Sequence, residues 1–139
     1  MIVYLIMLVL SILFLLLAER TEKKKFKILY YILSALPFFL VSAFRYDVGT
    51  DYITRYTYDF NTMVKGTDIP NLEIGFKTMV QIIIFFTTDP LPVFVISSAI
   101  IVGLVMATIF TKSKNMVLSI LIFFIGGFYF DSLNIMRQY

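Results

Sequence analysis

The 139-residue chain contains no cysteine and no histidine. Without these side chains a disulfide framework, a thiolate nucleophile, histidine acid–base catalysis and a Cys/His zinc site are excluded. Charged residues are also scarce, at 15% of the chain against about 25% in an average soluble domain. The net charge of +3 is small, and no basic face interleaved with aromatic residues predicts binding to nucleic acid. Chemistry in this chain must come from Asp, Glu, Arg, Lys, Tyr, Ser, Thr or Asn.

Hydrophobic residues make up 60% of the chain, and the mean hydropathy is +0.89. They occur in long uncharged runs, which are typical of helices that span a bilayer. We predict an all-α, polytopic integral membrane protein with about four to five transmembrane helices and one extracytoplasmic loop that carries an amphipathic helix. The whole of residues 1–139 forms a single membrane domain in this interpretation. The predicted spans are residues 2–18, 28–44, 93–110 and 116–130, and the amphipathic or re-entrant helix covers residues 73–88.

The charges around the first span predict the orientation of the chain. No Lys or Arg precedes "MIVYLIMLVLSILFLLLA" and no small-x-small cleavage site closes it, so a cleaved signal peptide fits poorly. The basic loop "ERTEKKKFK" follows, which by the positive-inside rule lies in the cytoplasm and places the N-terminus outside. Such a loop also suits contact with anionic membrane lipids. Residues 45 to 72 then form an external loop.

The segment over residues 73–88 leaves two topologies open. Glu73, Lys77 and Gln81 recur every fourth residue and form one polar stripe on a helix. If this helix spans the bilayer, the lysines of "TKSKN" at 111–115 fall outside, whereas they fall inside if it lies flat or re-enters. The positive-inside rule favours the second topology. Under it, the polar segments "RYDVGTDYITRY" (45–56) and "FYFDSLNIMRQY" (128–139) emerge on the same external surface.

These segments also carry a family resemblance. "RYDVGTDYITRY", then "EIGF" at 73–76, then "FDSLNIMRQ" at 130–138 resemble the EpsG family of Wzy-like integral membrane enzymes. The family is implicated in polymerising bacterial exopolysaccharide or capsule, so the resemblance implies a multi-pass protein of the bacterial cell membrane. Family members are longer, with further spans after the "RQ" motif. We therefore expect this chain to be the N-terminal part of a longer protein and to be inactive alone.

The resemblance implies a reaction between lipid-linked sugars at the outer leaflet. A hydroxyl of one oligosaccharide repeat unit attacks C1 of another, and the polyprenyl diphosphate that carried the second unit leaves. The implied partners are polyprenyl-diphosphate-linked oligosaccharide, membrane lipids and other membrane proteins of polysaccharide assembly. No cofactor is implied. Asp47 and Asp51 stand four residues apart without further ligands, so we expect no metal.

This chemistry assigns roles to individual side chains. Arginine binds a diphosphate bidentately, so Arg45 and Arg137 are expected to hold the leaving group. Asp51 is expected to take the proton from the attacking hydroxyl. The expected substrate contacts are Tyr52, Arg55, Tyr56, Glu73, Asn134 and Gln138.

Structural interpretations of the same residues stay open. Arg45 at the end of a span can reach the interface simply to solvate its charge. Asp51 can cap a helix over residues 52–60, and the tyrosines can form an interfacial aromatic belt. Glu73 and Lys77 can be a pair at a helix entry. Two alternative functions also stay open. One is a transporter or flippase component for lipid-linked sugars, and the other is a non-catalytic membrane scaffold.

Overall fold

The computed structural model describes residues 2–45, 52–70 and 72–134, and it contains no strand in these ranges. The prediction of an all-α protein is confirmed. The elements in chain order are α1 (Ile2–Arg20), α2 (Lys24–Ala43), the π-helical segment η1 (Tyr52–Thr57), α3 (Tyr58–Val64), α4 (Ile74–Phe86), α5 (Leu91–Lys112), α6 (Met116–Ile125) and α7 (Phe128–Asn134).

Among the described residues, α1, α2 and α5 are long and apolar enough to cross a membrane. They contain 19, 20 and 22 residues. With a rise of about 1.5 Å per residue, each matches a hydrocarbon core of about 30 Å. The protein is therefore a polytopic membrane protein. α2 begins at Lys24, four residues before the predicted span over 28–44, and it continues through Pro37 to Ala43. Lysine is a good helix former, so the first turn of α2 includes residues that were predicted to lie in the basic loop.

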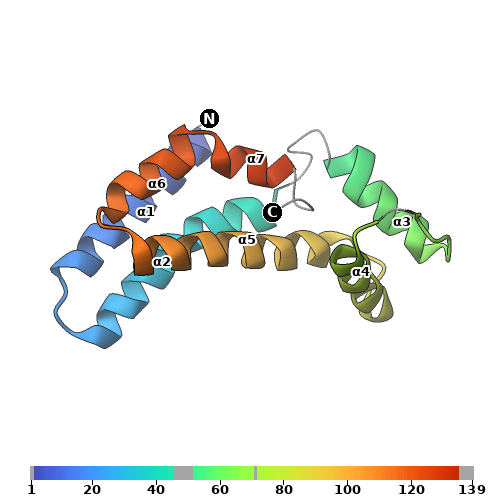
Figure 1. Cartoon of the computed structure of the whole chain (residues 1–139), viewed down its shortest axis with the longest axis horizontal. Helices are drawn as coiled ribbons and strands as arrows, with labels where there is room; N and C mark the ends of the chain where they lie inside the picture. Colours follow the sequence, from blue (N-terminus) through green and yellow to red (C-terminus); the bar gives the residue numbers. More distant parts are fainter. Residues whose placement is uncertain (1, 46–51, 71, 135–139) are drawn as a thin grey trace.

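The apolar run over residues 116–130, predicted as one span, is divided at Gly126 and Gly127. Gly126 ends α6, where its backbone N–H donates to the Ile122 carbonyl over 2.8 Å. Gly127 has a φ of +83°, in the left-handed region that glycine adopts without steric cost. α6 has 10 residues, so this helix covers about 15 Å, or half of the hydrocarbon core. The chain then bends, and α7 continues at an angle to α6 (Figure 1).

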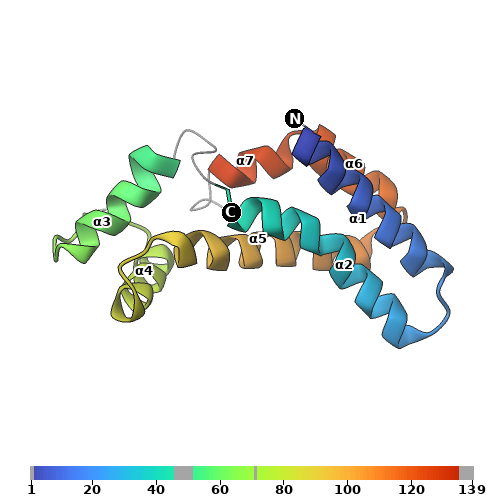
Figure 2. The same cartoon turned by 180° about the vertical axis from the view of Figure 1, so that it is seen from behind.

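α5 runs along much of the molecule, with α2 packed beside it and α1 packed on α2 (Figure 1). Helices α1, α2, α6 and α7 lie towards one end of the molecule, and α3 and α4 lie at the other, as the view from behind also shows (Figure 2). α2 runs antiparallel to α5, since Tyr31 stacks on Phe110 with ring centroids 4.7 Å apart while Ser42 Oγ lies 2.6 Å from Ser98 Oγ. Buried small residues let membrane helices approach closely, and their hydroxyls bond across the interface.

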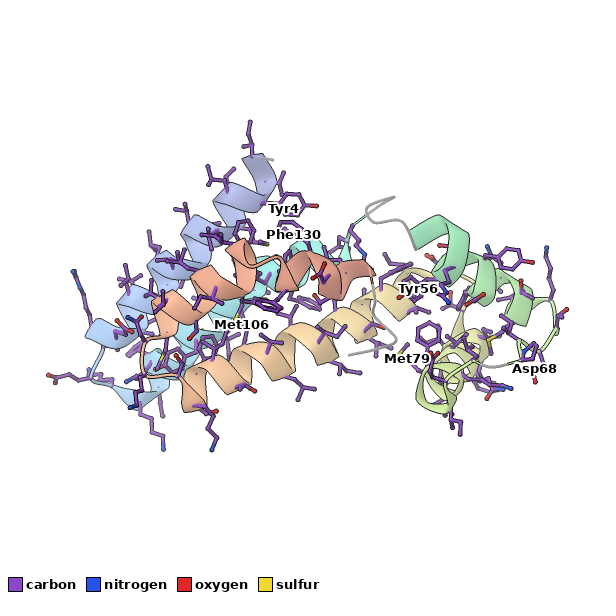
Figure 3. All side chains as sticks on the ribbon, turned by 45° about the horizontal axis from the view of Figure 1, so that its top comes forward. Tyr4, Tyr56, Asp68, Met79, Met106 and Phe130 are labelled. Carbon is purple, nitrogen blue, oxygen red and sulfur yellow. The ribbon has the colours of Figure 1, made fainter. Side chains whose placement is uncertain are left out.

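Aromatic side chains hold α7 against α1 and α2. Phe38 of α2 is fully buried, and its ring centroid lies 5.1 Å from that of Tyr129. The Tyr129 hydroxyl donates to the Phe38 carbonyl over 3.1 Å. Tyr4 of α1 lies beside Phe130 of α7, with ring centroids 5.2 Å apart (Figure 3). The beginning of α1, the second half of α2 and α7 therefore form one packed region.

Candidate functional site

Arg45 lies directly after α2 and is packed against α5. Its side chain is only 6% exposed, and its Cζ lies 5.6 Å from the centroid of the Phe94 ring. A guanidinium over an aromatic face is attracted by the ring quadrupole. This placement differs from an arginine that extends to the interface only to solvate its charge. The cation is held at a defined position after the end of α2, against Phe94 of α5.

Tyr56 belongs to the same aromatic cluster. Its ring centroid lies 6.3 Å from that of Phe94 and 5.8 Å from that of Phe76 on α4. Tyr56 is 2% exposed, so its ring packs inside the protein and does not offer a free face to a sugar. We therefore interpret Tyr56 as a residue that fixes η1 to the beginning of α5 beside Arg45.

The contacts of Arg45 also bear on the topology. Because Arg45 meets Phe94 and Ser42 meets Ser98, α2 ends where α5 begins. The chain thus leaves this end of the helical bundle after residue 45 and returns to it before residue 91. α4 has 13 residues and a length of about 20 Å, short of the hydrocarbon core. Both observations favour the topology in which residues 73–88 lie flat or re-enter.

The structure describes some of the other predicted site residues. Arg55 is an exposed residue of η1, and Glu73 is exposed at the N-cap position of α4. Tyr52 begins η1, and Asn134 ends α7. Asp51, Arg137 and Gln138 lie outside the described residues. The structure thus brings Arg45 and Tyr56 together through Phe94, and the roles assigned to the remaining residues stay predictions.

A comparison with known protein families identifies the family to which the chain belongs. The model of the EpsG family matches residues 28–139. The chain belongs to the EpsG family. The match includes the three segments that carry the resemblance, "RYDVGTDYITRY", "EIGF" and "FDSLNIMRQ". Comparisons with curated proteins and with solved structures gave no match. Family membership and the three long apolar helices together indicate a membrane protein associated with polysaccharide.

In this EpsG-family protein, Lys77 of α4 pairs with a residue of the preceding loop. Its ammonium Nζ lies 2.6 Å from Asp68 Oδ1 and donates to Asp68 Oδ2 over 2.9 Å (Figure 3 labels Asp68). The predicted partner of Lys77 at the helix entry was Glu73. The backbone N–H of Lys77 does donate to the Glu73 carbonyl, over 2.9 Å. The ion pair with Asp68 thus ties the loop between α3 and α4 to the first turns of α4.

This ion pair makes a prediction about pH. The hydrogen bond from Lys77 holds the pKa of the Asp68 carboxyl below its ordinary value. Because the folded-state pKa is lowered, the pair stabilises the fold above the unfolded-state value of about 3.9, and this contribution is lost as the pH falls through the folded-state pKa. Lys77→Met is expected to raise the pKa of Asp68 towards its ordinary value, as measured by NMR titration of that carboxyl. Lys65→Met, at an exposed lysine outside this ion pair, is the control. An unchanged Asp68 pKa in Lys77→Met would contradict the assignment.

The sequence did not single out Phe94 or Tyr129 as part of this region. Phe94 stands in the run "PLPVFV", where nothing distinguishes it from other apolar residues at the beginning of a span. Tyr129 is one of several aromatic residues around the polar segment at 128–139. A tyrosine whose hydroxyl is buried needs a hydrogen-bond partner. The hydroxyl group is the feature of the sequence that separates Tyr129 from the phenylalanines on either side of it.

Proposed function

We propose that this protein acts as a Wzy-like polymerase that joins polyprenyl-diphosphate-linked oligosaccharide repeat units in exopolysaccharide or capsule biosynthesis. The reaction takes place at the outer face of the bacterial cell membrane, with the N-terminus of this multi-pass protein outside. The placement of Arg45 is the observation that supports the proposal. A cation fixed at the end of a membrane helix can bind a lipid diphosphate at the level of the head groups.

The bond changes follow from the substrates. The oxygen of a hydroxyl on one repeat unit attacks C1 of the second unit, and the bond between C1 and the diphosphate oxygen breaks. The hydroxyl proton passes to the Asp51 carboxylate, and the two electrons of the broken bond leave with the polyprenyl diphosphate. Negative charge therefore grows on the diphosphate in the transition state, where Arg45 and Arg137 stabilise it.

The surroundings of Arg45 strengthen this role. Phe94 beneath the guanidinium is fully buried, and Arg45 itself has little contact with water. An ionic interaction is stronger in such a setting than in bulk water, since the effective dielectric constant is lower. The planar guanidinium donates two parallel hydrogen bonds to neighbouring phosphate oxygens. A group already held in place needs no reorganisation as the charge develops.

Further residues complete the proposed site. Arg55 and Glu73 are exposed on η1 and at the beginning of α4, and they are proposed to contact the sugars. Tyr52, Asn134 and Gln138 are proposed for the same purpose on the basis of the family resemblance. Tyr56 is proposed to position the others through its contact with Phe94.

The test replaces Arg45, Asp51 or Arg137 with Ala in the full-length protein and measures polymer length. Each variant is expected to accumulate single lipid-linked repeat units on the outer side of the membrane. Arg20→Ala is the matched control, since Arg20 is an exposed arginine in the last turn of α1, and it is expected to leave polymer length unchanged. Repeat units held on the cytoplasmic side would indicate a flippase instead. Polymer of normal length from all three variants would overturn the catalytic assignment.

A further inference from the structure

Helix α4 carries large apolar side chains that are exposed in the described part of the structure. Phe85 is 84% exposed, Phe86 is 79% exposed and Ile82 is 58% exposed. Ile74, in the first turn of the same helix, is 84% exposed. The rings of Phe85 and Phe86 pack edge to face, with centroids 5.3 Å apart. Contact between so much apolar surface and water is unfavourable, so this side of α4 requires an apolar neighbour.

The opposite side of α4 is already packed against the protein. Val80 and Ile83 are buried, and they form one cluster with Phe60 of α3 and Val93 of α5. α4 is therefore apolar on two sides, one of which faces the other helices. A helix that is hydrophobic around most of its circumference belongs in a protein core or in a membrane.

A third side of α4 faces water. Lys77 is the one charged residue between positions 74 and 86, and it pairs with Asp68, whose side chain is 71% exposed. A polar, hydrated side next to an exposed apolar side is the pattern of a helix that lies in the interface between a bilayer and water.

The turn after α4 places this helix at the boundary of the membrane. The backbone N–H of Asp89 donates to Thr87 Oγ1 over 3.1 Å, and Asp89 Oδ1 accepts from the backbone N–H of Leu91 over 2.9 Å. Leu91 begins α5, which is long enough to cross the bilayer. Phe86 is five positions before Leu91 (91 − 86), so the two residues lie at most about 18 Å apart. The end of α4 is therefore close to the level at which α5 enters the membrane.

The direction of α4 fits a position along the membrane surface. In Figures 1 and 2, α4 lies across the direction of α5 and does not continue it. With α5 crossing the bilayer, α4 is directed along the plane of the membrane. A re-entrant helix would instead run into the bilayer beside α5.

We propose that the exposed side of α4 formed by Ile74, Ile82, Phe85 and Phe86 is inserted among the phospholipid acyl chains of the leaflet at which α5 begins. α4 then lies in the membrane plane as an anchor for the segments after α2. Phe76 of α4 transmits this position to η1, because its ring centroid lies 5.8 Å from that of Tyr56. The proposal concerns the placement of this helix in the bilayer and does not depend on the proposed reaction.

Tryptophan fluorescence of the purified full-length protein in phosphatidylcholine vesicles tests this. The 139 residues contain no tryptophan, and the emission of the unsubstituted protein is subtracted. Ile74→Trp and Phe85→Trp are measured in ordinary vesicles and in vesicles whose lipid carries bromine on acyl-chain carbons near the head group. An interfacial helix buries its apolar side about 5–10 Å into the boundary between head groups and acyl chains, so brominated lipid is expected to lower the emission of both variants by about twofold or more, to the same extent. Thr67→Trp is the matched control, since Thr67 is exposed in the loop beside Asp68. Its emission is expected to be quenched by aqueous iodide and not by brominated lipid.

Three other outcomes would each overturn the proposal. Quenching of Phe85→Trp by brominated lipid together with quenching of Ile74→Trp by iodide alone would indicate a re-entrant helix. Quenching of both variants by iodide as strongly as Thr67→Trp would place this side of α4 in water. Protection of both variants from both quenchers would show that another protein segment or a second copy of the chain covers it. Ile82→Trp and Phe86→Trp give the same reading at neighbouring positions if one of the first variants does not fold.

Discussion

Full-length protein carrying Arg45→Lys is expected to extend polymer about 100-fold more slowly than the unsubstituted protein. Lysine keeps the positive charge but has no planar fork for two parallel hydrogen bonds to a diphosphate. It also lacks the guanidinium carbon that lies 5.6 Å from the Phe94 ring centroid. The measurement is the rate of chain growth from lipid-linked repeat units in isolated membranes.

The control for this substitution is Arg20→Lys, at the exposed arginine that ends α1. Its rate is expected to equal that of the unsubstituted protein. If Arg45→Lys also retained the full rate, charge alone would suffice at this position. The geometric account of Arg45 would then be wrong, although an electrostatic role would remain.

Phe38→Ala is expected to lower the free energy of unfolding by about 3–5 kcal/mol. Phe38 is 0% exposed, and its ring packs against those of Phe123 and Tyr129, at centroid distances of 5.9 and 5.1 Å. Within a membrane, helices associate through van der Waals packing, so a cavity at this point removes contacts that the bilayer does not replace. The loss also loosens α7, whose Tyr129 hydroxyl bonds to the Phe38 carbonyl.

Phe85→Ala is the matched control for the stability measurement. Phe85 on α4 is 84% exposed, so its truncation is expected to change the free energy of unfolding by no more than about 0.5 kcal/mol. Reversible unfolding in mixed micelles gives both values. Equal destabilisation by the two substitutions would show that the cluster around Phe38 is not the packing centre of the bundle.

The length of the apolar runs made the helical fold predictable. A charge-free run near the thickness of the hydrocarbon core has few alternatives to a helix, because a bilayer offers no partners for free backbone groups. The same reasoning predicted one span over residues 116–130 and missed the end of α6 at Ile125. Glycines in an apolar run can allow close approach of membrane helices, but the conformation of Gly126 and Gly127 ends the helix, with a φ of +83° at Gly127. Composition alone does not separate these two uses of glycine.

The candidate site was predictable to a smaller extent. Arg45 stood out as a charge at the end of an apolar run, but its contact with Phe94 joins residues 49 positions apart (94 − 45). Periodicity shows which side of a helix is apolar and not which distant helix covers it. Tyr56 was expected to meet substrate, whereas its burial between Phe94 and Phe76 comes from the way η1 and α4 fold onto α5. Asp51 and Arg137 depend on the family resemblance and remain predictions.

The claim that Arg45 holds the diphosphate is tested most directly by a binding cycle with purified full-length protein. The affinities of polyprenyl diphosphate and uncharged polyprenol are measured for the unsubstituted protein and for Arg45→Ala. We predict that the unsubstituted protein prefers the diphosphate, that Arg45→Ala reduces this preference by about tenfold or more, and that the affinity for polyprenol is the same in both. An undiminished preference for the diphosphate in Arg45→Ala would contradict the account.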